Sequence, residues 1–249
     1  MDTIKRILEK HYQKNLLLCE KDEKNRRYIQ DKYAHAYRTL ECGQAIAPAD
    51  IAADTLAAVL LLHDIGRFYE HLQLADFKHA EYGVRLLKDE GFTDMNILLP
   101  VKYHETDDWQ TALAADDDYQ KLPAAAQNNV RLLCRILIDA DIIDNMQILA
   151  KTDIQTSATM SLTTAITDCL LADKPANNKD VHNRADAIVY ILCGLALINL
   201  EKSRQYLQEK HIVQNLVQRL FELAANNAAL QNDVCEIRDK INETYHFQI

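Results

Sequence analysis

Residues that interrupt helices are scarce along this chain. Five glycines and four prolines occur in 249 residues, well below the usual combined share of about 12%. An all-β fold needs a turn about every 8–12 residues and would require more of them. Apolar residues instead recur at intervals of three and four along most of the chain, which is typical of amphipathic helices. We therefore expect an all-α fold.

The helical pattern also suggests how the chain is organised. We expect an N-terminal helix within residues 1–24 and a core of about five helices over residues 25–150. Residues 151–249 should form additional C-terminal helices that pack on this core or supply an oligomer face. The acidic, alanine-rich stretch 106–127 is expected to be a surface insertion.

Within these regions, we expect a loop over residues 70–78. Apolar spacing predicts separate helices over residues 51–63, 79–89, 128–150, 184–205, 208–225 and 229–245.

Charge and cysteine usage narrow the classes of protein to consider. A net charge of −9 argues against binding to a nucleic acid duplex or to an anionic membrane surface. It leaves a phosphorylated substrate open, because a bound divalent metal inverts the local field. The six cysteines show no C-x-x-C spacing and lie mostly in apolar helical contexts, which favours reduced thiols. With no signal-peptide h-region and no apolar run of about 20 residues, we expect a cytoplasmic protein without a membrane partner.

One pair of residues stands out against this background. His63 and Asp64 close the apolar run LAAVLLLHDIGRF, so an imidazole and a carboxylate emerge together from a buried helix end. A buried carboxylate is costly unless something positive accompanies it, and a metal ion is one such partner. Taken singly, each further candidate is more readily explained as a core histidine or a helix-end charge than as a metal ligand. These candidates, in half-apolar helical contexts, are His35, His79, His104 and Asp141.

Together, these residues resemble the HD-domain superfamily of metal-dependent phosphohydrolases. The stretch LLLHDIGR is similar to the central HDIG-type motif of that superfamily. His35 followed by Arg38 is similar to its first motif, H-x-x-R, and ILIDADIID to its closing segment, with Asp141 in the ligand place. The resemblance covers roughly residues 25–150, about half the chain.

The resemblance and the residue chemistry suggest a metal site. Two imidazoles and two carboxylates (His35, His63, Asp64 and Asp141) can approach one ion, and this mixed donor set suits Fe, Mn, Co, Ni or Zn, with Mg also open. In branches of the family with extra histidines, a second ion is held by residues in the places of His79 and His104 and is bridged through the HD aspartate. Whether one or two ions bind is left open. Asp139 lies about 200° from Asp141 around a helix, and we expect it to be a solvated or capping carboxylate.

The reaction implied is hydrolysis of a phosphoester or phosphoanhydride of a small phosphorylated molecule, with a nucleotide as one option. A metal-activated hydroxide would attack, and Asp64 would hold the metals. Arg38, Arg67 and Lys78 are candidate contacts to the phosphate, and Lys102 is a weaker one. For each of these cations, surface solvation is the alternative.

Two other readings remain open. The core can be a degenerate binding or scaffolding module, although its full ligand set argues against this, or it can carry the diiron oxygenase chemistry of a minority of the superfamily. The segment HETDDW, which begins at His104, lacks the Gly-Tyr-Pro sequence of the cyclic-di-GMP phosphodiesterase branch. The resemblance therefore does not imply cyclic-di-GMP as the substrate. The substrate and the oligomeric state, including a homo-oligomer, stay open.

Overall fold

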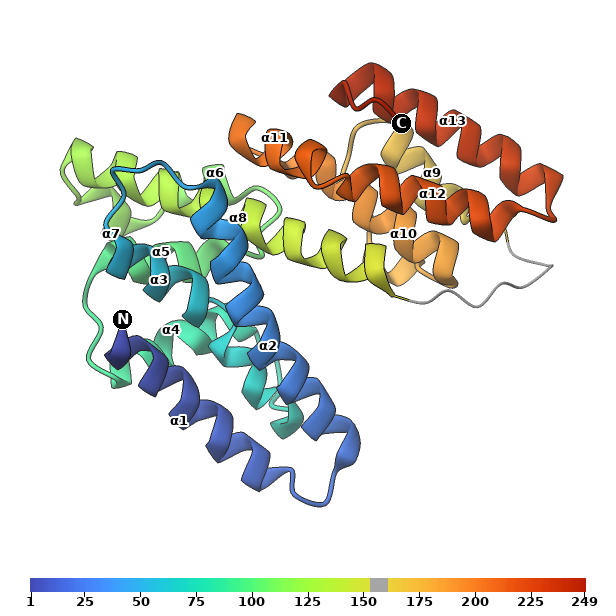
Figure 1. The fold of residues 1–249 in the computed structure, drawn as a ribbon. Helices are drawn as coiled ribbons and strands as arrows, with labels where there is room; N and C mark the ends of the chain where they lie inside the picture. The colour runs from blue at the N-terminus through green and yellow to red at the C-terminus, as the bar shows by residue number, and fades with distance from the viewer. Residues whose placement is uncertain (153–160) are drawn as a thin grey trace. The chain divides into compact units, whose positions relative to one another are not determined.

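The computed structural model describes residues 1–152 and 161–249. All regular secondary structure in these residues is helical, which confirms the all-α expectation (Figure 1). The elements are α1 (Asp2–Leu18), α2 (Glu23–Ile46), α3 (Ala53–Leu62), the 3-10 helix η1 (Ile65–Leu72), α4 (His79–Asp89), α5 (Met95–Tyr103), α6 (Trp109–Ala114), α7 (Asp117–Gln120), α8 (Ala124–Lys151), α9 (Thr164–Leu171), the 3-10 helix η2 (Asn178–Asp180), α10 (Arg184–Cys193), the 3-10 helix η3 (Gly194–Leu197), α11 (Glu201–Glu209), α12 (Ile212–Ala224) and α13 (Ala228–Tyr245). The chain forms two compact units, Met1–Asp141 and Ile142–Ile249, and the division falls within α8.

Helix α3 is the centre of the first unit. Its residues from Leu56 to Leu62 are at most 5% exposed, and the helix packs against α1, α2 and α5. A helix that is apolar on all sides is stable only when neighbours cover it all round. This burial explains the uninterrupted apolar run, and it carries His63 and Asp64, which follow directly, into the interior.

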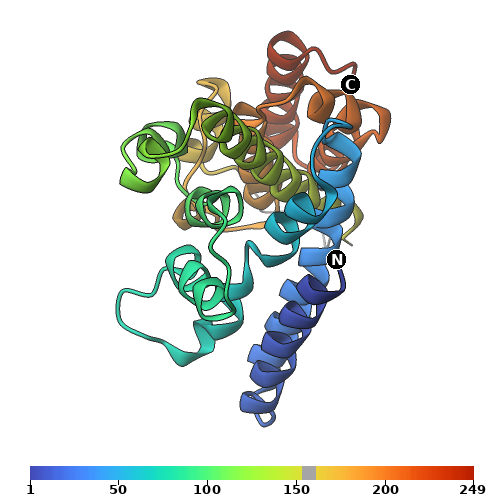
Figure 2. The ribbon, with the colours of Figure 1, turned by 90° about the vertical axis from the view of Figure 1, so that its left-hand side faces the viewer.

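Helices α1 and α2 lie side by side in both views of the ribbon (Figures 1 and 2). The rings of Tyr12 and Tyr33 stack between them, with centroids 4.0 Å apart. At the start of α2, the Asp22 side chain accepts a hydrogen bond from the backbone N–H of Asn25, which satisfies one of the free donors of the first turn. His35 is itself a buried residue of α2, as is Thr39 one turn further along.

The backbones of η1 and α4 approach each other closely at Gly66. A Cβ atom at this position would lie 2.0 Å from the carbonyl oxygen of His79, so only glycine fits. The approach brings the start of α4, and with it His79, next to Asp64. The expected loop over 70–78 is shorter than predicted, because η1 continues to Leu72 and the turn begins at Gln73, which adopts a left-handed conformation with φ of 49°.

The acidic stretch between α5 and α8 is anchored to the first unit. It contains α6 and α7, and Trp109, Leu113 and Tyr119 are buried there. Asp116 caps α7 by accepting hydrogen bonds from the backbone N–H groups of Asp118 and Tyr119. The predicted insertion is therefore helical and packed, with Asp117 and Asp118 exposed and its large apolar residues turned inward.

The second unit is built around α9, α10, α12 and α13, which pack on one another. The single helix predicted over residues 184–205 is interrupted, since α10 ends at Cys193 and α11 begins at Glu201. At the break, Gly194 lies against Ile142, whose side chain would be 3.2 Å from a Cβ atom placed there. Among the helices of the described residues, we find none with the length and apolar character needed to cross a bilayer.

Candidate metal centre

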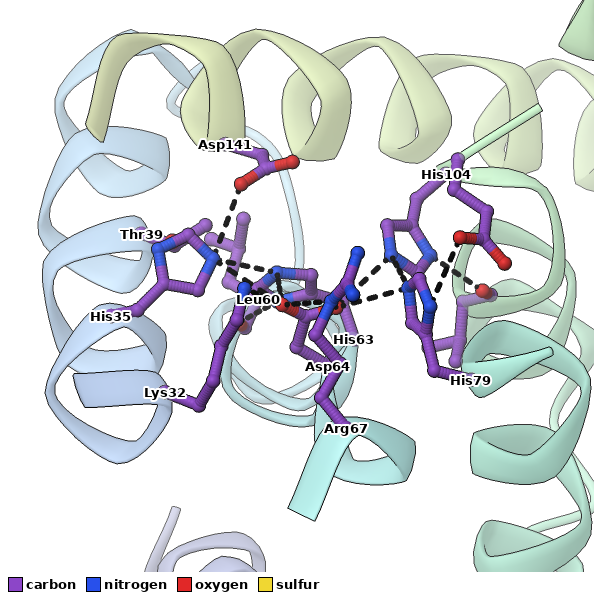
Figure 3. Close-up of polar contacts among 12 residues, drawn as sticks. Lys32, His35, Thr39, Leu60, His63, Asp64, Arg67, His79, His104 and Asp141 are labelled. Atoms are coloured by element: carbon purple, nitrogen blue, oxygen red, sulfur yellow. Dashed lines mark hydrogen bonds and ion pairs between the residues drawn. The ribbon is translucent and has the colours of Figure 1, made fainter. Parts of the chain in front are cut away.

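Asp64 lies between two pairs of histidines (Figure 3). Its Oδ1 atom is 3.3 Å from the Nε2 atoms of both His79 and His104. Its Oδ2 atom is 3.7 Å from Nε2 of His35 and 3.8 Å from Nε2 of His63. Each oxygen of one carboxylate thus faces its own pair of imidazoles.

Within each pair, the imidazole nitrogens face one another. The Nε2 atoms of His35 and His63 are 3.2 Å apart, and those of His79 and His104 are 3.3 Å apart. Asp141 joins the first pair, with its Oδ1 atom 3.1 Å from Nε2 of His35. All six predicted ligands therefore meet in one place, contributed by α2, the ends of α3 and α5, the start of α4, and α8.

These side chains form two groups that can each hold an ion. The first group consists of His35, His63 and Asp64, with Asp141 beside it, and the second consists of Asp64, His79 and His104. Asp64 belongs to both. We refer to them as the first pocket and the second pocket.

The helix ends orient two of the histidines. His63 follows α3 and His104 follows α5, and each donates from Nδ1 to the carbonyl oxygen three residues earlier, at 2.9 Å to Leu60 and 2.8 Å to Val101. Those carbonyls belong to a last helical turn, where acceptors lack partners within the helix. A carbonyl oxygen only accepts, so Nδ1 carries a proton, and in the neutral ring the lone pair is then on Nε2.

The other two histidines are held by side chains. Nδ1 of His79 lies 3.0 Å from Oε2 of Glu105, and a carboxylate likewise leaves the proton on Nδ1. Nδ1 of His35 lies 3.4 Å from the hydroxyl oxygen of Thr39, one turn further along α2. All four rings are thereby turned so that Nε2 points into the centre.

This arrangement fits a divalent metal. In the second pocket, the Nε2 atoms of His79 and His104 face each other across 3.3 Å, and such an approach is unfavourable between two lone pairs unless a cation or a proton lies between them. Neutral imidazole nitrogens and carboxylate oxygens are ligands of Fe, Mn, Co, Ni and Zn. A histidine that ligates a metal usually donates the N–H of its other ring nitrogen to a carboxylate or a backbone carbonyl.

Burial and charge set the protonation of the centre. Burial lowers the pKa of His63 to about 3, so this ring is neutral at physiological pH. Burial by itself would raise the pKa of Asp64, but the imidazoles of His63, His104 and His79 and the ammonium of Lys32 hold it well below its ordinary value. A charged carboxylate and a neutral imidazole are the forms that ligate a metal.

Two cations also contact Asp64. Lys32 donates from Nζ to Oδ2 at 2.9 Å, and Arg67 donates from Nε to both carboxylate oxygens at 3.1 Å. Arg67 also donates from Nη1 to Oε1 of Glu70 at 2.8 Å. The Tyr28 hydroxyl donates to the other oxygen of Glu70. The charge of the carboxylate is thus compensated by two cations, Lys32 and Arg67 (Figure 3).

The other predicted cations lie in different surroundings. Arg38 is half-buried on α2. Lys78 is 67% exposed and pairs with Glu81 at 3.2 Å, and Lys102 pairs with Asp116 at 2.6 Å. A phosphate contact by Arg38 or Lys78 stays a prediction. The expectation that Asp139 is solvated was wrong, because that side chain is fully buried.

Lys32 and Glu105 complete the centre, although neither was a candidate from the sequence. Each nevertheless has a simple sequence signal. Lys32 precedes His35 by three residues, so it shares the same face of α2. Glu105 directly follows His104, just after the end of α5.

The comparison with protein-family models agrees with this geometry. Residues 33–146 match the family model of the HD domain. The fold and the site together define an all-helical domain with a buried cluster of histidines and aspartates. Over this segment, the chain belongs to the HD-domain superfamily, whose members are generally metal-dependent phosphohydrolases. No curated protein and no solved structure matched the chain.

Proposed function

We propose that the first unit is a dinuclear metal-dependent phosphohydrolase that acts on a small phosphorylated molecule. The observation that carries this proposal is the position of Asp64, whose two oxygens each face a separate pair of histidine Nε2 atoms. One carboxylate placed between two such pairs is suited to bridge two ions.

The residues of the chain prepare the two pockets for metal. The carbonyl oxygens of Leu60 and Val101 and the Glu105 carboxylate hold the Nδ1 protons of three rings. The opposite nitrogens are therefore free to ligate without a rearrangement. His35, His63, Asp64 and Asp141 would hold one ion, and Asp64, His79 and His104 the other. When bound, two such ions supply an activated water and stabilise the charge that develops on a phosphoryl group.

Access to the centre favours a small substrate. The histidines and Asp64 are buried, and five partly exposed side chains surround them. These are Lys32, Arg67, Glu70, Glu105 and Asp141, whose side chains are 22–36% exposed. A phosphoryl group that enters between them meets the guanidinium of Arg67, which is held in place by Glu70 and can donate to phosphate oxygens.

The number of ligands makes the two pockets unequal. The first pocket offers four side chains and the second three, so the second would leave more of a bound ion open to other ligands. Open positions on a metal are where water and substrate bind in catalytic sites. We therefore assign the substrate phosphate chiefly to the side of His79 and His104.

The test begins with protein stripped of metal and then loaded with Mn²⁺, Fe²⁺, Co²⁺, Ni²⁺, Zn²⁺ or Mg²⁺. We expect the loaded protein to hydrolyse an aryl phosphate or members of a panel of nucleotides, and the stripped protein to be inactive. His104→Ala should abolish turnover, while Lys88→Ala, an exposed substitution on α4, should not. Metal uptake without turnover on any phosphorylated compound would instead favour a binding or scaffolding module.

A further inference from the structure

Lys32 is a flexible cation that contacts Asp64. It lies three residues before His35 on α2, and its ammonium is 2.9 Å from Oδ2 of Asp64. The lysine side chain is 22% exposed, whereas that of Asp64 is 6% exposed. Lys32 therefore reaches from the partly solvated edge of the centre to the carboxylate that both pockets share.

Lys32 and Arg67 differ in what else holds them. Arg67 donates to Glu70 as well as to Asp64, and Glu70 in turn accepts from Tyr28. Within residues 1–152 and 161–249, Asp64 is the only carboxylate within ion-pair distance of Lys32. If Asp64 were engaged elsewhere, Arg67 would keep an anchor and Lys32 would lose its partner.

A divalent ion held in the first pocket would compete with Lys32 for the same atom. The Oδ2 oxygen that accepts from Lys32 is also the oxygen that faces Nε2 of His35 and of His63. An ammonium at hydrogen-bond distance from a ligating oxygen would also be repelled by the ion. Lys32 must then turn towards the solvated edge, where a substrate phosphate enters.

We propose that Lys32 exchanges partners during the cycle. It neutralises Asp64 while the centre lacks metal, and it contacts a phosphate oxygen of the substrate once Asp64 has become a metal ligand. This inference rests on the proposed dinuclear phosphohydrolase function and adds a residue to it. A lysine suits the role because its ammonium is a point charge on a flexible stem, which needs no fixed orientation towards a phosphate.

The exchange links two binding events. Metal binding removes the partner of Lys32 and so makes an ammonium available to phosphate. Phosphate binding holds the ammonium away from Asp64 and so strengthens metal binding. Such a coupling is necessarily reciprocal.

Titration calorimetry on the whole chain tests the exchange with two probes, Mn²⁺ on the stripped protein and inorganic phosphate on the Mn²⁺-loaded protein. We expect Lys32→Met to bind Mn²⁺ about threefold or more tightly and phosphate about tenfold or more weakly. Lys32→Arg should restore phosphate binding. Lys24→Met, an exposed position two turns away on α2, should match the wild type with both probes.

The outcomes separate this inference from the proposed function. Unchanged phosphate affinity in Lys32→Met would overturn the exchange, because Lys32 would then be a counter-ion only. Unchanged Mn²⁺ affinity would also overturn it, because no competition would exist. Failure of the wild type to bind Mn²⁺ would overturn the proposed function itself, before any variant is compared.

Discussion

The Nδ1 atom of His79 lies 3.0 Å from the Oε2 atom of Glu105. Glu105 is thus the carboxylate that fixes one ligand of the second pocket, while the other histidine of that pocket is fixed by a backbone carbonyl. Mutation can remove the first support but not the second. Glu105 therefore gives experimental access to one pocket alone.

Replacing Glu105 by Ala should weaken metal binding at the second pocket about 10- to 100-fold, because the ring of His79 loses the acceptor that orients it. Binding at the first pocket should be unaffected. A Mn²⁺ titration that resolves a tight and a weak class of sites measures this. Glu105→Gln is the matched control, because its amide oxygen can still accept from Nδ1. An equal loss at both pockets would contradict the assignment.

The two pockets should also be separable through their ligands. We expect His104→Ala to retain the ion of the first pocket and to lose that of the second. His35→Ala should lose the ion of the first pocket, since the ring contributes Nε2 there and contacts Asp141. Elemental analysis of the purified variants measures the metal content per chain. If His104→Ala lost all metal, the pockets would not be independent.

Gly66 should be intolerant of any side chain. A Cβ atom there would lie 2.0 Å from the carbonyl oxygen of His79 and 3.0 Å from the backbone nitrogen of Gly83. Backbone atoms cannot give way as a flexible side chain can. We expect Gly66→Ala to lower the free energy of unfolding by about 2 kcal/mol or more and to weaken metal binding in the second pocket. Denaturant unfolding and a Mn²⁺ titration measure the two effects.

Gly83→Ala is the control for this substitution. Its Cβ atom would have no neighbour closer than 3.5 Å, and it lies inside α4, where alanine is favoured over glycine by about 0.5–1 kcal/mol. This variant should be as stable as the wild type or slightly more stable. If Gly66→Ala proved equally harmless, the close approach of η1 and α4 would not be what places His79.

The six ligand candidates could be identified from the sequence because their order and motifs resemble those of the HD-domain superfamily, whereas local context alone would not have singled out each of them. His63 and Asp64 end an apolar run, and Asp141 lies within another. Within α8, the carboxylate of Asp141 lies beside the imidazole of His35. What kept Asp139 from solvent could not be foreseen, because the burial of α8 depends on helices distant in the chain.

The resemblance implied that the histidines pair about Asp64, but local sequence context alone could not predict this pairing. The pairing depends on the close approach of η1 and α4. Gly66 permits this approach, but a glycine in the sequence does not by itself predict it. Lys32 and Glu105 do not stand out either, because charged residues on helices are usually solvated and each acquires its role only from a partner far along the chain. Lys32 meets Asp64, 32 positions away.

Asp116 provides a pH-dependent contribution to stability. Burial would raise the pKa of its carboxyl, but hydrogen bonds from Lys102, Tyr103 and the Tyr119 backbone lower it from 3.8 to about 2. A group with a lowered folded-state pKa stabilises the fold above its unfolded value and loses that contribution as the pH falls through the folded value. The stabilisation is therefore complete above about pH 4 and declines towards pH 2.

Asp116→Asn isolates the charge, because asparagine caps helices as well as aspartate does. We expect it to lower the free energy of unfolding by about 1 kcal/mol at pH 7, a value that allows for the partial exposure of Lys102. The difference from the wild type should shrink at pH 3. Urea unfolding at both pH values measures it. A difference that is the same at both would exclude the ion pair as its source.

The claim on which the account depends is that one carboxylate serves both pockets. Metal content of Asp64→Ala, compared with the wild type by elemental analysis after reconstitution with Mn²⁺, tests it most directly, with helical content checked by circular dichroism. We predict two ions per chain in the wild type and none in the folded variant, together with loss of phosphohydrolase turnover. A folded Asp64→Ala protein that keeps either ion at wild-type affinity would contradict the account.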